Sequence, residues 1–142
     1  MDELLNCILK KYSNINKIEA WGETSLFYNP GKLKRGIYFC TFKIKDGPND
    51  KDSNLNRKNT FRFNFQISKE NFIKFFKKIP KRTQKNTGFN YEVIDQLTPH
   101  PVYAWMQWVS IINPSILSIK KFEYLIHEAY LKCMDKYNEK NL

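Results

Sequence analysis

Residues 98–103 read Thr-Pro-His-Pro-Val-Tyr and place a histidine between two prolines. A residue that precedes proline is restricted to extended conformations, so His100 lies on a stiff segment outside any regular helix. Its imidazole could act as a base or stack on a ring, which predicts a ligand site at His100 and Tyr103. The alternative is structural, with the imidazole bonded to a backbone carbonyl and packed on an aromatic side chain. No serine or cysteine nucleophile motif accompanies the histidine, so we assign no catalytic residue.

A second group of candidate residues lies on a predicted strand. Residues 60–67 alternate strictly between polar and apolar types, which is typical of a strand with one buried face and one polar face. The side chains that could bond an anionic or amide group here are Arg57, Arg62 and Asn64. If the polar face lines a groove, it is a binding surface. If it is covered, Arg62 needs an acidic partner such as Glu19 or Glu23.

A basic segment, residues 69–85, contains seven lysines and arginines and one acid, Glu70, for a net charge of +6. The whole chain carries +10. Such a segment suits contacts with phosphates. The candidate nucleic-acid contacts are Lys74, Lys77, Lys78, Lys81, Arg82 and Lys85. The alternative is a solvated helix end in a lysine-rich chain, because lysine outnumbers arginine 20 to 4 and arginine is the better reader of bases.

Two tryptophans, Trp105 and Trp108, follow the histidine segment. In a regular strand, residues three apart face opposite sides. We predict that Trp108 lies in the core and that Trp105 is exposed, where it could stack on a base or a ring-shaped ligand.

The elements that must position these residues follow from hydrophobic periodicity. Helices are predicted over residues 2–13, 69–79, 91–97 and 118–137. Extended chain is predicted over 18–28, and strands over 37–45, 60–67 and 102–112. The polar residues 46–54 are predicted to form a solvated loop. This order predicts one α+β domain over residues 1–142, a twisted, mostly antiparallel sheet with helices packed on one side.

The composition excludes several kinds of protein. The three cysteines are widely spaced, which indicates free thiols in a reducing cytoplasm rather than a zinc or redox site. The two histidines, His100 and His127, stand far apart without a carboxylate cluster, so we expect no metal and no cofactor. No apolar run is long enough to span a membrane, and the acidic start argues against a secretory signal. We expect a cytoplasmic protein.

Several short motifs together resemble a family of small bacterial proteins of unknown function. They are Trp21-Gly22, Phe27-Tyr28, Phe61-Arg62-Phe63-Asn64, Pro99-His-Pro-Val-Tyr103, Trp108-Val109 and Asn113-Pro114. The C-terminal part is also similar to the wider MmcQ/YjbR-like group, whose compact α+β fold is compared with that of frataxin. The resemblance implies a fold more than an activity, although members of that group are often labelled as predicted DNA-binding proteins.

Three functional hypotheses remain open. The first is a non-catalytic binding module that contacts nucleic acid or another polyanion through the basic segment, and it requires the lysines, Arg57 and Arg62 to share one surface. The second is a small-molecule or enzymatic pocket between the histidine segment and the polar strand face. The third is an adaptor for a protein partner, which an exposed aromatic patch would indicate.

Overall fold

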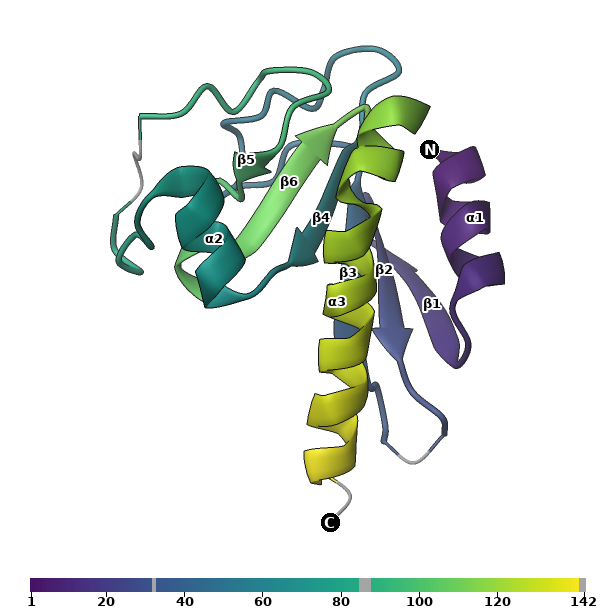
Figure 1. The fold of residues 1–142 in the computed structure, drawn as a ribbon. Coiled ribbons are helices and arrows are strands. Elements are labelled where there is room, and N and C mark those ends of the chain that lie inside the picture. The colour runs from purple at the N-terminus through teal and green to yellow at the C-terminus, as the bar shows by residue number, and fades with distance from the viewer. Residues whose placement is uncertain (32, 85–87, 141–142) are drawn as a thin grey trace.

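In a computed structural model, which describes residues 1–31, 33–84 and 88–140, the chain forms a six-stranded antiparallel sheet with helices on one face (Figure 1). The strands lie in the order β1-β2-β3-β4-β6-β5. Their bounds are β1 Ile15–Ala20, β2 Glu23–Tyr28, β3 Ile37–Lys43, β4 Arg62–Gln66, β5 Thr98–Pro99 and β6 Trp108–Ile112. The helices are α1 Asp2–Lys11, α2 Lys69–Phe76, the short 3-10 helix η1 Ala104–Met106, and α3 Ile116–Lys140. The predicted α+β class is therefore confirmed.

The strict alternation of β4 produces a two-faced central strand. Phe63 and Phe65 are fully buried beneath the helices, and the polar residues between them point to the opposite face, because side chains alternate along a strand. β4 pairs with β3 and β6, so its backbone N–H and C=O groups are hydrogen-bonded to a neighbouring strand on both sides. This strand fixes the position of Arg62 and Asn64.

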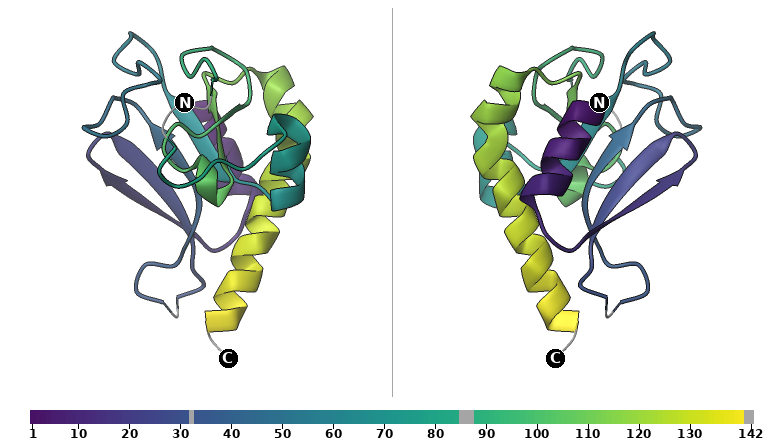
Figure 2. Two further views of the ribbon diagram at one scale, coloured as in Figure 1. Left: turned by 90° about the vertical axis from the view of Figure 1, so that its left-hand side faces the viewer. Right: turned by 90° about the vertical axis from the view of Figure 1, so that its right-hand side faces the viewer.

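Helix α3 covers the apolar face of the sheet, and α1 and α2 lie on the same side (Figure 2). The buried residues of α3 recur at helical spacing; they are Phe122, Leu125, Ile126, Ala129, Tyr130, Cys133 and Tyr137. α2 begins at an N-cap, Ser68, whose side chain accepts a hydrogen bond from the backbone N–H of Asn71, as expected for a serine at this position. The opposite face of the sheet is left to loops.

The segment before α3 differs from its prediction. Residues 91–97 form turns instead of a helix, with a single parallel bridge from Ile94 to Ile112. The strand predicted over 102–112 begins only at Trp108, because η1 precedes it and Gln107 adopts a left-handed φ of 65° that breaks the extended chain.

Candidate functional site

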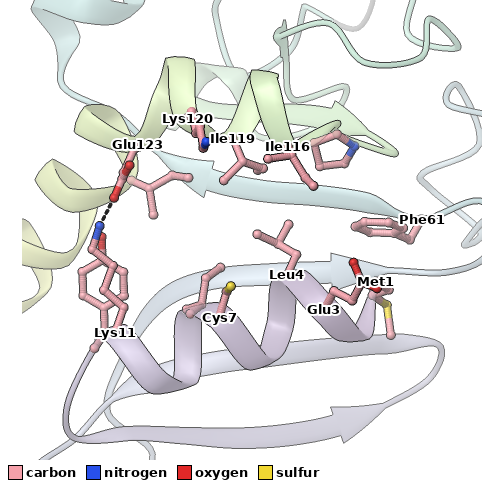
Figure 3. Close-up of a pocket in the computed structure, with 14 residues that line it drawn as sticks. Met1, Glu3, Leu4, Cys7, Lys11, Phe61, Ile116, Ile119, Lys120 and Glu123 are labelled. Carbon is pink, nitrogen blue, oxygen red and sulfur yellow. Dashed lines mark hydrogen bonds and ion pairs between the residues drawn. The ribbon is translucent and has the colours of Figure 1, made fainter.

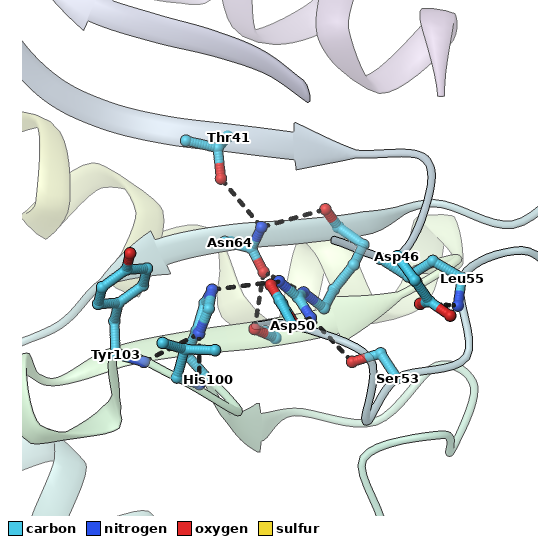
Figure 4. Close-up of polar contacts among 11 residues, drawn as sticks. Thr41, Asp46, Asp50, Ser53, Leu55, Asn64, His100 and Tyr103 are labelled. Carbon is cyan, nitrogen blue, oxygen red and sulfur yellow. Dashed lines mark hydrogen bonds and ion pairs between the residues drawn. The ribbon is translucent and has the colours of Figure 1, made fainter. Parts of the chain in front are cut away.

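Arg62 lies at the centre of a buried polar network on the face of the sheet that the helices leave open. Figure 4 shows its partners Asp50, Ser53, Asn64 and His100. Arg62 is 1% exposed. Its guanidinium donates to both carboxylate oxygens of Asp50, at 2.8 and 2.5 Å, and to the hydroxyl of Ser53 at 2.9 Å. Its Nε donates to Oδ1 of Asn64 at 2.8 Å. A bidentate, charge-assisted pair of this kind fixes the guanidinium plane.

The acidic partner of Arg62 is therefore Asp50, and the expectation of Glu19 or Glu23 is wrong. Burial by itself raises the pKa of the Asp50 carboxyl, but the hydrogen bonds and charge of Arg62 outweigh it, so the pKa lies below its ordinary value. The pair consequently remains ionised at neutral pH.

The loop that supplies Asp50 was expected to be solvated, and this holds only in part. Pro48, Asn49, Lys51, Asp52 and Asn54 are exposed, whereas Asp50 is partly buried and Ser53 is buried. Residues 46–54 fold over the polar face and are tied down at both ends. The carboxylate of Asp46 accepts from the backbone N–H of Leu55 at 2.7 Å, and the backbone N–H of Asp46 donates to the side chain of Asn56 at 3.0 Å. Leu55 is completely buried. Polar composition therefore identifies the loop as mainly exposed, but it does not reveal which of its side chains fold back onto the sheet.

Arg57 holds the end of the same loop. Its guanidinium donates to the backbone carbonyls of Asn54, Ser53 and Glu92, at 2.8, 3.0 and 3.1 Å. Carbonyls of two loops that are distant in sequence are thus joined by one side chain. Arg57 therefore holds these two loops together beside the Arg62 network.

Asn64 is fully buried and connects the hydrogen-bond network to β3. Its Oδ1 accepts from Arg62 and from the hydroxyl of Ser110, the latter at 2.7 Å. Its Nδ2 donates to the hydroxyl oxygen of Thr41 at 2.9 Å. Because an amide oxygen has two lone pairs, these three contacts define which end of the amide is oxygen.

His100 lies against Arg62 and is 5% exposed. Its Nδ1 accepts from the backbone N–H groups of Val102 and Tyr103, at 3.0 and 3.1 Å, and its Nε2 lies 3.2 Å from Nη2 of Arg62. The ring packs on Tyr103, with centroids 5.1 Å apart. Burial and then the Arg62 charge hold its pKa well below the ordinary value, so the imidazole is neutral. The imidazole thus bonds backbone N–H groups, where the structural alternative expected a carbonyl.

A pocket of about 310 Å³ adjoins this network. Its lining residues are Glu23, Tyr38, Thr41, His100, Tyr103, Met106 and Trp108. Two of the five predicted ligand residues, His100 and Tyr103, line it. Arg62 and Asn64 lie behind the wall and orient lining groups, and Arg57 braces the loop.

Trp108 was expected in the core and instead lies on the wall of this pocket, at an edge-to-face angle to Tyr38. The sequence interpretation missed Thr41 and Met106, and it considered Glu23 only as a partner for Arg62. The register could have identified Thr41, which pairs directly with Asn64 across β3 and β4.

Glu23 contributes a carboxyl group to the pocket wall. Burial raises its pKa above the ordinary value, and the charges of Lys43 and Arg62 only partly oppose this. In the register of β2 and β3, Glu23 pairs with Lys43 and Ser25 pairs with Thr41, so Glu23 and Thr41 are diagonal neighbours on one face of the sheet.

The basic residues on and after α2 lie on the surface, apart from the pocket network. Those that the structure describes are all exposed: Lys74, Lys77, Lys78, Lys81 and Arg82. Lys85 lies outside the described residues. Arg82 stacks over the ring of Trp105, 4.9 Å from its centroid. Since Arg62 is buried and Arg57 is bound to loop carbonyls, these two arginines do not extend the basic surface.

A second, apolar pocket of about 470 Å³ lies on the helical side, between α1 and the start of α3 (Figure 3). Leu4 and Cys7 of α1 face Ile116 and Ile119 of α3 across it. An ion pair between Lys11 and Glu123 lies at one end. Among the residues that the structure describes, its lining forms no buried polar network of the kind found behind the first pocket.

No group of three or more His, Cys, Asp and Glu side chains is arranged to hold a metal ion among residues 1–31, 33–84 and 88–140. Within the same ranges, no helix combines the length and the apolar character needed to cross a bilayer.

The comparisons with known proteins give a family without an assigned activity. A model for a family of unknown function, DUF6194, matches residues 1–141. No curated protein and no solved structure matched the chain. Since the matched residues span nearly the whole sequence, the chain belongs to the DUF6194 family.

Proposed function

We propose that this protein binds a small organic molecule in the pocket formed by Tyr38, Thr41, His100, Tyr103 and Trp108. The observation that carries the proposal is a pocket with aromatic walls that ends on a largely buried, hydrogen-bonded polar network. Ligand sites typically combine apolar and aromatic walls with a few polar groups in fixed positions. The volume of about 310 Å³ lies at the lower end of the range for such sites.

The network behind the wall supports binding because it is rigid before any ligand arrives. Arg62 is held by Asp50, Ser53 and Asn64, and His100 is held by two backbone N–H groups. A ligand would therefore bind to groups that need no reordering, which lowers the entropic cost of binding.

The same geometry favours binding over catalysis. The lone pair on Nδ1 of His100 already accepts two hydrogen bonds, and its lowered pKa makes it a weak base. General-base catalysis works best with a pKa near the working pH. We therefore assign His100 to recognition and orientation.

A calorimetric screen of small ring compounds tests the proposal, with Met106→Trp as the blocking variant, because Met106 lines the pocket and is 39% exposed. Cys7→Trp is the matched control, since Cys7 is exposed and lines the other pocket. We expect compounds that bind the wild type and the control but bind the blocked variant at least about tenfold more weakly. Binding that is lost only in Cys7→Trp would overturn the proposal.

A second candidate function is polyanion binding through the exposed basic residues on and after α2. Among the described residues, the ion pairs are Lys11–Glu123, Lys17–Glu19 and Arg62–Asp50, and none of them includes a basic residue of this surface. Lysines without acidic partners suit phosphate contacts that carry no sequence information. The relation to the MmcQ/YjbR-like group, from which a DNA-binding role was expected, remains a prediction.

A further inference from the structure

The hydrogen bonds around His100 define where its ring proton lies. A neutral imidazole carries one N–H and one acceptor nitrogen. Nδ1 accepts hydrogen bonds from two backbone N–H groups, so a proton on Nδ1 would face two other hydrogen-bond donors and break both bonds. Placing the proton on Nε2 opposes only one, the Nη2 group of Arg62 at 3.2 Å. The Nε2–H tautomer is therefore favoured.

With this tautomer, two buried donors lack an acceptor. Nε2–H of His100 faces Arg62, which has no lone pair, and no other partner of Nε2 lies among the described residues. The Nη2 hydrogen that Arg62 does not give to Asp50 points to the same place. A buried donor without an acceptor is costly, and His100 lines the pocket, where an acceptor atom could enter.

Thr41 adds a second donor to the wall of this pocket, beside His100. Its hydroxyl oxygen accepts Nδ2–H of Asn64 at 2.9 Å, and the direction of this bond is fixed because Oδ1 of Asn64 accepts from Arg62 and Ser110. The hydroxyl hydrogen must consequently point elsewhere, and no acceptor for it lies within the described part of the chain. Thr41 lines the pocket, so its O–H is available to a ligand.

One hydrogen-bond acceptor lies beside these donors. The carboxyl group of Glu23 lines the pocket and is a diagonal neighbour of Thr41 on the sheet. The remaining wall is largely aromatic, with Tyr38 and Trp108 set edge to face. The wall therefore offers donors and an acceptor side by side next to flat apolar surfaces.

We infer that the pocket recognises the cyclic-amide edge of a flat ring. The ring carbonyl oxygen accepts from His100 and Thr41, and the adjacent ring N–H donates to Glu23. This edge occurs in pyrimidine and purine bases and in other lactams. The inference rests on the proposed function, because it assigns a ligand class to the same pocket.

The tautomer can be measured without a ligand. In a long-range ¹H–¹⁵N spectrum of the imidazole, we expect Nε2 of His100 to be protonated and Nδ1 to be unprotonated. His100→Asn is the matched variant, because its Oδ1 can still accept from the two backbone N–H groups while the Nε2 donor is lost. A proton on Nδ1 of His100 would overturn the inference while leaving the proposed function intact.

The ligand class is tested with 2-pyridone, which has the required edge, and with N-methyl-2-pyridone, which lacks the N–H. We expect 2-pyridone to bind about tenfold more tightly than its methyl derivative. Thr41→Val and His100→Asn should each weaken 2-pyridone about tenfold. Both residues line the pocket, so the binding of indole, a ring without a carbonyl, should also weaken, but by a smaller factor.

The outcomes separate the two proposals. If indole and both pyridones bind equally in the pocket, the inference fails and the proposed function stands. If phenylalanine binds and 2-pyridone does not, the site recognises a zwitterion and the inference also fails. Uracil serves as a second lactam and distinguishes a nucleobase site from a general cyclic-amide site. If no ring compound binds, the proposed function fails together with the inference.

Discussion

Arg62 directs its donors inward, to Asp50, Ser53 and Asn64. Such an arginine stabilises the fold only while its partners are present, because removing one charge leaves the other buried and unpaired. Arg62 therefore holds the pocket wall in place, and the proposed ligand contacts the side chains that Arg62 orients.

Replacing Arg62 with Met should therefore destabilise the protein strongly. We expect the free energy of unfolding to fall by about 3 kcal/mol, since Asp50, only 15% exposed, loses its counter-charge. Urea unfolding of the variant measures this, with Arg35→Met at an exposed position as the control. Equal stability of the two variants would contradict the described network.

His100 should give the stability a pH dependence. Its pKa in the folded state lies well below the ordinary value because the ring is buried beside Arg62. Below about pH 6.5 the unfolded chain takes up a proton that the folded state rejects, so stability falls by up to about 1.4 kcal/mol per pH unit. Above that pH both states are neutral and the effect is absent.

Unfolding midpoints measured between pH 5 and 8 check this dependence. His100→Asn should lose the part of the slope below about pH 6.5, while His127→Asn, at an exposed histidine, should retain it. A His100→Asn curve parallel to that of the wild type would show that the imidazole titrates normally in the folded protein.

At the level of elements, the loop over residues 46–57 converts the polar face of β4 into a buried wall. Leu55 anchors it and is 0% exposed. We expect Leu55→Ala to cost about 3 kcal/mol, through lost burial and a residual cavity. Leu117→Ala, at a site that is 79% exposed, should cost less than about 0.5 kcal/mol. Chemical denaturation compares the two, and a small effect at Leu55 would mean that the loop is loosely attached.

The sequence predicted the helices and strands that show a local hydrophobic period. It did not reveal the contacts that the irregular loops make. The alternation of residues 60–67 correctly predicted β4 and the face of Arg62 and Asn64. It could not identify Asp50, because a polar loop has no period that reports which side chain folds back. The position of Trp108 was predicted wrongly because η1 and the left-handed Gln107 place it at the start of β6.

For the whole molecule, the exposed basic surface and the pocket are separate features. The net charge of +10 attracts polyanions without specifying them. If the second candidate function holds, RNA or DNA should lose roughly a hundredfold in affinity between 50 and 200 mM salt, as expected for about four phosphate contacts. Fluorescence anisotropy measures this dependence.

A charge-matched pair of variants assigns that binding to the surface. Neutralising four residues of the basic surface should abolish it; they are Lys77, Lys78, Lys81 and Arg82. A control with the same change in charge, made elsewhere on exposed positions, should reduce affinity only slightly; its residues are Lys17, Lys34, Lys51 and Lys140. Equal losses in the two variants would mean that net charge alone is responsible.

The central claim, that the pocket beside His100 binds a small ring compound, is tested most directly by a ¹H–¹⁵N NMR titration of the labelled protein. We expect 2-pyridone to shift the amide signals of Thr41 and Tyr103 and the indole signal of Trp108, and to leave those of α1 unchanged. Shifts confined to the groove between α1 and α3, or no shifts with 2-pyridone, indole or phenylalanine at millimolar concentration, would contradict the claim.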